Sequence, residues 1–100
     1  MEVQFRTRRL QTQYENHREA EKAYGRDVAR KFILRINTIK ATRNIEELCS
    51  QIVLRCHALK GDRRGQWAIN LTGFYRLIFT LQGETTQMVK IEEVSKHYDN

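Results

Sequence analysis

Four cationic side chains lie close together in the segment Leu59–Phe79, which reads LKGDRRGQWAINLTGFYRLIF. Lys60, Arg63 and Arg64 belong to a glycine-containing loop, and Arg76 follows in a run of residues with the pattern of a strand. An arginine donates two parallel hydrogen bonds to phosphoryl oxygens, and a strand would hold it at a fixed position. Such a cluster could bind or cleave a phosphodiester, because cleavage requires cations that neutralise the pentacovalent phosphate.

Cleavage of an RNA strand by its own 2′-hydroxyl group also requires side chains that accept and donate protons. His97 is suited to this role because imidazole titrates near neutral pH. Tyr98, its neighbour, could assist the proton transfer or stack on a base. Lys60 could act as a base if burial among other cations favoured its neutral form, or it could remain a fixed positive charge. Together with Arg76, these residues are the candidate catalytic groups.

The same residues also have structural interpretations. Arg76 could form an ion pair with Glu92 or Glu93 on a neighbouring strand. The cationic loop could be an ordinary solvated turn. His97 and Tyr98 could belong to a frayed chain end. These alternatives stay open from the sequence.

The hydrophobic pattern predicts helices in the first half of the chain. Apolar residues at helical spacing predict a first helix over Arg8–Tyr24, which Gly25 ends. A second helix is expected from Asp27 onwards, where an acidic residue suits the positive end of the helix dipole. A third helix is expected after Asn44, a good capping residue, with apolar positions as far as Ile52.

A period of two predicts strands at residues 3–5, 55–59, 66–71, 75–81 and 87–94. Helices followed by strands predict an α+β fold, with N-terminal helices packed on one face of a small, mainly antiparallel twisted β-sheet. The first strand would join the sheet beside a later one, and the second face would stay open. Arg76 alternates with Leu77 and Phe79, so we expect it on the open face. His57 is interpreted as a strand residue without a functional role.

Cationic side chains also occupy the remaining faces of the second predicted helix: Arg26, Arg30, Lys31 and Arg35. The simplest interpretation is a solvated surface. The alternative is a positively charged wall against RNA or an acidic protein segment, to which Arg30 and Arg35 would contribute. The side chains expected to neutralise RNA phosphates in the loop are Lys60, Arg63 and Arg64.

The composition limits the kind of protein. One hundred residues predict one domain, residues 1–100, and a net charge of +6 favours a polyanionic partner, although a basic surface without a specific partner has the same composition. Cys49 and Cys56 have no metal-binding spacing with the scattered histidines, so no metal or other cofactor is expected. Neither a secretory signal nor an apolar run of roughly 20 residues is found, which predicts a cytoplasmic protein without membrane contact and with both cysteines reduced.

The segment LKGDRRGQWAINLTGFYRLIF, with the strand that follows it, resembles the RelE/ParE toxin superfamily. Within that superfamily the chain is most similar to the HigB-type branch, the plasmid maintenance killer proteins. The preceding NIEELCSQIVLRCHAL also resembles the segment that leads into the LKGD motif of this branch. The resemblance extends from about Ile39 to Val94 and is looser over the first two helices.

The resemblance implies a RelE-like fold and the toxin of a type II toxin–antitoxin system. Such toxins are metal-independent endoribonucleases that cleave messenger RNA on the ribosome and inhibit translation. The implied partner is a cognate antitoxin, of a helix-turn-helix, HigA-like type. Members of the branch end the last strand with an acidic residue, a tyrosine and a histidine, whereas this chain reads EEVSKHYD, in another order. Glu93 could correspond to the acidic member.

Three functions are compatible with these observations. The first, which we expect, is a ribosome-dependent messenger RNA endonuclease. The second is a ParE-like poison of DNA gyrase, which would share the fold but would not need a proton-transfer pair. The third is a non-toxic interaction module.

Overall fold

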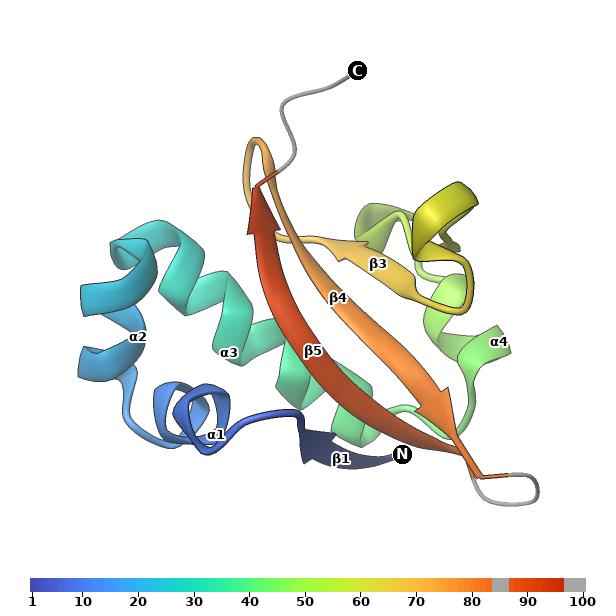
Figure 1. The fold of residues 1–100 in the computed structure, drawn as a ribbon, viewed down its shortest axis with the longest axis horizontal. Coiled ribbons are helices and arrows are strands. Elements are labelled where there is room, and N and C mark those ends of the chain that lie inside the picture. The colour runs from blue at the N-terminus through green and yellow to red at the C-terminus, as the bar shows by residue number, and fades with distance from the viewer. Residues whose placement is uncertain (84–86, 97–100) are drawn as a thin grey trace.

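The computed structural model describes residues 1–83 and 87–96, in which helices pack on one face of a mixed five-stranded sheet (Figure 1). The predicted α+β fold is therefore confirmed. The helices are α1 (Arg8–Glu15), α2 (His17–Tyr24), α3 (Arg26–Ala41) and α4 (Ile45–Cys49), with two 3₁₀ turns, η1 (Ile52–Leu54) and η2 (Gly61–Arg63). The strands are β1 (Glu2–Phe5), β2 (His57–Ala58), β3 (Trp67–Asn70), β4 (Tyr75–Gln82) and β5 (Met88–Lys96).

The first predicted helix is in fact two helices, because the chain turns at Asn16. The backbone of Asn16 is extended, with φ −131° and ψ 104°, and its side chain accepts a hydrogen bond of 3.0 Å from the backbone N–H of Arg18. Asparagine is a favoured N-cap since its side chain satisfies an N–H group that has no partner within the helix. Residue Asn16 therefore ends α1 and starts α2.

The third predicted helix and the strand after it are both shorter than expected. Helix α4 ends at Cys49, and Ile52 belongs to the separate turn η1. Arg55 follows this turn with a left-handed backbone, φ 50°, so the strand that was predicted over 55–59 is reduced to His57–Ala58.

The five strands have the order β1-β5-β4-β3-β2. β1 lies beside β5, which confirms the prediction that the first strand joins a later one, and the two strands are parallel. The other neighbouring strands are antiparallel. On β4, Leu77 and Phe79 pack into the core, so Arg76 lies on the opposite face. We call this second face the open face. The predicted position of Arg76 on it is confirmed.

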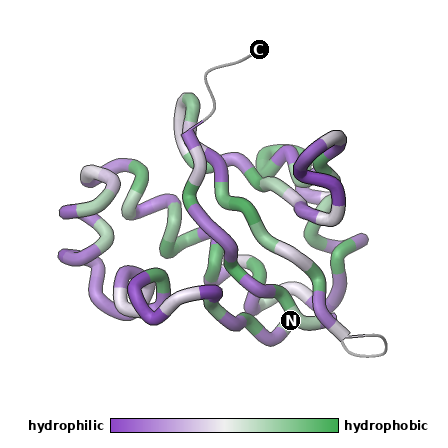
Figure 2. The backbone as a smooth tube through the Cα atoms, in the orientation of Figure 1, coloured by the Kyte–Doolittle hydropathy of each residue, from purple (hydrophilic) through white to green (hydrophobic). Residues whose placement is uncertain are grey.

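The core lies between α3 and the middle of the sheet. Fully buried residues of α3, Phe32, Ile36 and Ile39, belong to one apolar cluster with Leu77 and Phe79 of β4. Figure 2 shows the apolar character of β4, the strand in the centre of the sheet. This packing fixes the position of β4 and hence of Arg76.

A β-bulge places two carboxylates on the open face. Ile78 is paired with Glu93 and Phe79 with Ile91, so Glu92 has no residue opposite it on β4. An extra residue lets two neighbouring side chains lie on the same face of a strand. Glu92 accepts a hydrogen bond of 2.8 Å from Thr80 of the open face, and Glu93 lies beside it.

Cys49 and Cys56 form a disulfide, with their Cα atoms 4.8 Å apart. The prediction of two reduced thiols is therefore wrong for this structure. The number of cysteines and the expected compartment could not reveal that the end of α4 lies next to the residue before β2. A Cα separation of about 4.4–6.8 Å suits a disulfide.

Among the described residues, no helix has both the length and the apolar character needed to span a bilayer.

Candidate active site

A cavity of about 230 Å³ opens on the sheet where β2, β3 and the β3–β4 turn meet. Its lining includes two arginines, a histidine and an asparagine, whose side chains could contact a phosphodiester, together with an alanine and a phenylalanine: Arg55, Arg76, His57, Asn70, Ala68 and Phe74. The strand register explains why they meet. His57 is opposite Ala68, and Asn70 is opposite Arg76, so all four share the open face. The small side chain of Ala68 leaves space between His57 and Arg76.

Arg76 lines this cavity and has a buried donor that no described residue satisfies. Its Nε atom is buried and makes no hydrogen bond with any of the described residues. The ion pairs of the described glutamates on the open face go to other arginines: Glu92 to Arg6 and Glu93 to Arg63. A buried donor without an acceptor is unfavourable by about 1–3 kcal/mol. The alternative of an ion pair between Arg76 and Glu92 or Glu93 is therefore not found among the described residues, and the Arg76 guanidinium is available to an acceptor such as a phosphoryl oxygen.

His57 is held in one orientation by the backbone. Its Nδ1 atom lies 2.7 Å from the carbonyl oxygen of Arg55. Because a carbonyl oxygen only accepts hydrogen bonds, Nδ1 must carry the proton, which leaves a lone pair on Nε2 in the neutral ring. The ring is exposed and lines the cavity with Arg76. Sequence reasoning missed this residue, because its place in the site depends on the pairing of β2 with β3, and a strand of two residues gives no sequence signal for that pairing.

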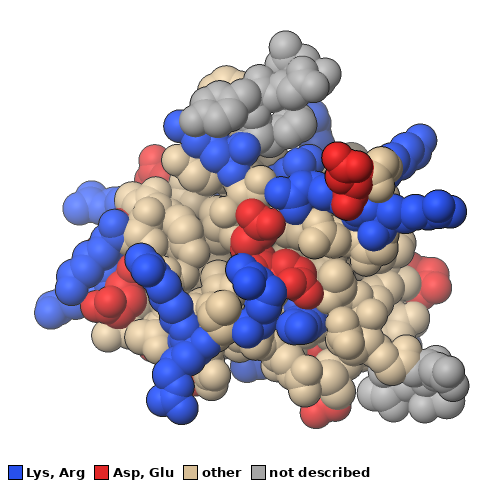
Figure 3. Space-filling model, viewed as in Figure 1, with Lys and Arg blue, Asp and Glu red and all other residues tan. Residues whose placement is uncertain are grey.

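The cationic loop borders the open face at η2. Lys60 and Arg64 are exposed and line another cavity together with Gly61. Since Lys60 is exposed, the burial on which its role as a base depends is absent. Figure 3 shows cationic side chains spread over this side of the molecule around a small acidic group.

Arg63 reaches from η2 across the open face to β5. Its Nη1 atom donates to the Gln66 side chain at 2.8 Å and to Glu93 Oε2 at 3.2 Å. Ile78 is paired with Glu93 and is fully buried although it lies on the open face. Arg63 and Glu93 therefore form a polar cover over the sheet, and the Glu93 carboxylate already has a cationic partner.

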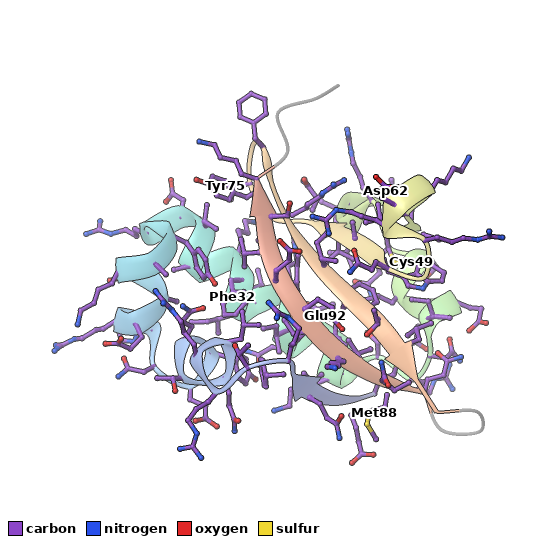
Figure 4. The ribbon with its side chains drawn as sticks, in the orientation of Figure 1. Phe32, Cys49, Asp62, Tyr75, Met88 and Glu92 are labelled. Atoms are coloured by element: carbon purple, nitrogen blue, oxygen red, sulfur yellow. A yellow bond between two sulfur atoms is a disulfide. The ribbon has the colours of Figure 1, made fainter. Side chains whose placement is uncertain are left out.

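Glu92 occupies the next position along β5, near its middle (Figure 4). Its carboxylate lies 3.6 Å from Arg6 Nε and accepts the hydrogen bond from Thr80. Both glutamates of the bulge, Glu92 and Glu93, thus have hydrogen-bond and ion-pair partners within the protein.

Arg35 is a buried structural residue, so its predicted position on a solvated, RNA-binding helix face is wrong. Its side chain packs between α3 and the sheet, and Nε donates a hydrogen bond of 3.1 Å to the carbonyl oxygen of Asn70. Desolvation by burial lowers the pKa of Arg35. The contact supports the end of β3, at the residue that pairs with Arg76.

Arg30 is exposed but lies apart from the cationic loop. It lines a cavity between α2 and α3 together with His17 and Glu21. The first turns of α3 are beside α2, on the other side of the molecule from η2 (Figure 1). The structure therefore does not join Arg30 to Lys60 and Arg64 in one surface.

The predicted proton-transfer pair, His97 and Tyr98, lies outside the described residues. Strand β5 itself is longer than predicted and continues to Lys96, with Ser95 opposite Arg76. Within the described part of the chain, no cluster of three or more His, Cys, Asp or Glu side chains could hold a metal ion.

No protein-family model and no curated protein matches the sequence. By structure, the chain is similar to the YoeB/ParE toxin from Agrobacterium tumefaciens, with a TM-score of 0.65, 20% identity and coverage of 98% of this chain and 100% of that chain. It is also similar to YafQ from E. coli strain BL21(DE3), with a TM-score of 0.60, 14% identity and coverage of 95% and 91%. At these identities the likeness shows a RelE-like fold, and it does not single out the HigB-type branch.

Proposed function

We propose that this chain, which has the fold of the YoeB/ParE and YafQ structures, is the toxin of a type II toxin–antitoxin system and cleaves messenger RNA on the ribosome. The observation that carries the proposal is the cavity that Arg76, which has no ion-pair partner among the described residues, shares with the oriented ring of His57. A fixed cation and a proton-transfer group at one small cavity are the minimum for cleaving a phosphodiester.

In the proposed reaction, the ribose 2′-oxygen attacks the adjacent phosphorus, and the bond from phosphorus to the 5′-oxygen breaks. The attacking hydroxyl group loses a proton and the leaving oxygen gains one, which gives a 2′,3′-cyclic phosphate and a 5′-hydroxyl. Arg76 would neutralise the phosphoryl oxygens. His57 would accept one proton at Nε2, and the second carrier is expected to be His97 or Tyr98.

Other residues around the cavity would bind the RNA. Phe74 is 58% exposed at the β3–β4 turn and lines the cavity, so its ring is free to stack on a base. Lys60 and Arg64 are exposed cations that would neutralise phosphates. Glu93 would act through Arg63, which it holds in place, rather than as an acid or base.

The partners and the compartment follow from the same proposal. A net charge of +6 suits RNA on the ribosome, and it also suits an acidic segment of an antitoxin. We propose a cognate antitoxin, of the helix-turn-helix, HigA-like type, that silences the toxin in the cytoplasm.

The test uses the purified chain with translating ribosomes and a defined message, without a reducing agent, and primer extension to map new 5′ ends. We expect cleavage inside the coding region. Arg76→Ala should lower the rate by about 10²–10³-fold, and His57→Ala by at least about 10²-fold. Arg18→Ala and His17→Ala, which change exposed residues of α2, are matched controls and should cleave at the wild-type rate.

Circular dichroism of each variant separates a catalytic effect from loss of the fold. If the rates fall only in proportion to the folded fraction, Arg76 and His57 are structural residues and the proposed site is wrong. Intact messages together with inhibited DNA gyrase would favour the ParE-like alternative. Intact messages and active gyrase would favour a non-toxic interaction module.

A further inference from the structure

The disulfide between Cys49 and Cys56 closes the segment that leads directly into the candidate active site. Cys56 precedes His57 in the chain, and Arg55, whose carbonyl oxygen orients the His57 ring, lies inside the closed loop. Both Arg55 and His57 line the cavity with Arg76. The position of the disulfide and the orientation of the imidazole are therefore connected through two residues of backbone.

Besides the disulfide, the loop is held by backbone hydrogen bonds of η1, from Leu54 N–H to Gln51 at 3.0 Å and from Arg55 N–H to Ile52 at 3.1 Å, and by little side-chain packing. Ile52 and Val53 are 90% and 69% exposed, and Arg55 is also exposed. Leu54 is the one residue between the two cysteines that is buried. Arg55 has a left-handed backbone, which is uncommon for a residue other than glycine. A loop with one apolar anchor and one unfavourable backbone conformation depends on its covalent closure to keep this shape.

We propose that Cys49 and Cys56 are a reversible redox modification site that sets the orientation of His57, with the disulfide form as the more active form. The proposal rests on the proposed cleavage of RNA at this site. Reduction frees the loop, and the Arg55 carbonyl group is then no longer held against His57 Nδ1. The neutral imidazole then exchanges its proton between Nδ1 and Nε2, so a smaller fraction presents the Nε2 lone pair to the RNA.

The reaction that forms the bond is thiol–disulfide exchange with a small disulfide such as oxidised glutathione. One cysteine thiolate attacks the glutathione disulfide, which forms a mixed disulfide and releases one glutathione. The second cysteine thiolate attacks the protein sulfur of the mixed disulfide and releases a second glutathione. Two protein thiols are thereby oxidised and one glutathione disulfide is reduced to two thiols. Both cysteines are partly accessible, as this exchange requires.

The primary test measures the His57 ring by ¹⁵N NMR in alkaline buffer, where an imidazole is neutral, in the oxidised and reduced forms of the full chain. We expect the Nδ1–H tautomer to dominate in the oxidised form and a mixture of tautomers in the reduced form. His17, exposed on α2, is the internal control and should not change. The double variant Cys49→Ser/Cys56→Ser should resemble the reduced form whether or not glutathione disulfide is added. Identical His57 tautomers in the two redox forms would overturn the proposal.

The second test compares single-turnover RNA cleavage by the two forms. We expect reduction to slow cleavage by about 10- to 100-fold, the order of loss that follows displacement of a reacting group by about 1 Å. Equal rates would overturn the link between the cysteines and activity. If neither form cleaves RNA while the His57 tautomer still responds to reduction, the proposed function has failed but the redox coupling has not.

Discussion

Replacing Arg35 separates a structural role from the RNA-binding role that its charge suggests. Arg35→Met keeps most of the apolar stem of the side chain but removes the donor to the Asn70 carbonyl oxygen, which Nε contacts at 3.1 Å. Hydrogen bonds from charged donors contribute about 1.5–3 kcal/mol. Burial of the guanidinium is itself unfavourable, since desolvation lowers the pKa of Arg35, and the methionine side chain does not carry this cost. The net loss of folding free energy should therefore be near the lower limit of that range, about 1.5 kcal/mol.

Arg35→Ala should be more destabilising because it also removes two buried methylene groups. At about 0.8 kcal/mol for each group, the total loss becomes about 3 kcal/mol. Arg30→Ala is the matched control, since it removes an arginine from the same helix at an exposed position, and it should change stability by less than about 0.5 kcal/mol. Urea denaturation, read by circular dichroism, gives the free energy of unfolding of each variant.

RNA binding gives the second readout for the same variants. Because Arg35 is buried, the folded fraction of Arg35→Met should bind RNA with the wild-type dependence on salt concentration. If Arg35→Met is as stable as Arg30→Ala but its RNA affinity depends less steeply on salt concentration than that of the wild type, Arg35 contacts the RNA. The structural interpretation is then wrong.

Two further predictions concern charged side chains. Arg64→Ala should lower the slope of log affinity for single-stranded RNA against log salt concentration by about 0.7. Arg63→Ala should lower this slope less, since Arg63 is already paired with Glu93, and equal slopes for both variants in a filter-binding titration would contradict this. The hydrogen bond from Arg43 lowers the pKa of Glu47 from its ordinary value of 4.5, so this carboxylate stabilises the fold above that pH, and the benefit is lost as the pH falls through the lowered pKa. Glu47→Gln should therefore be less stable than wild type at pH 7, and thermal melts should show the difference vanish at low pH; a difference that persists there would exclude the charge as its cause.

The strand pattern of the sequence was sufficient to orient Arg76. Alternation with Leu77 and Phe79 decides which face a strand residue occupies, so its position could be predicted without any tertiary information. The cavity around it could not be predicted in the same way. His57 reaches the site because of the pairing of β2 with β3, and a strand of two residues carries too little pattern to reveal its register.

The errors have distinct physical causes. Arg35 follows Phe32 at helical spacing on the buried side of α3, but charged residues are normally exposed to solvent. The partner of Arg35 is a backbone carbonyl group of β3, which has no sequence signature. The sequence does not reveal the break between α1 and α2 at Asn16, because apolar residues continue at helical spacing on both sides of this cap. The disulfide joins two segments whose proximity depends on how α4 and η1 pack, which no local pattern shows.

The parallel pairing of β1 with β5 has a consequence for the timing of folding. Arg6, just after β1, donates a hydrogen bond from Nε to the backbone carbonyl oxygen of Glu92, which lies 86 residues later in the chain. Closing a loop of this length costs roughly 4 kcal/mol of chain entropy, and the closure is not possible until β5 has been synthesised. A chain growing on a ribosome would therefore carry the cationic loop before it carries Glu93, which holds Arg63 across the open face. A protein with the proposed activity would complete its RNA-binding surface only after β5 has been synthesised, which delays its action on the message that encodes it.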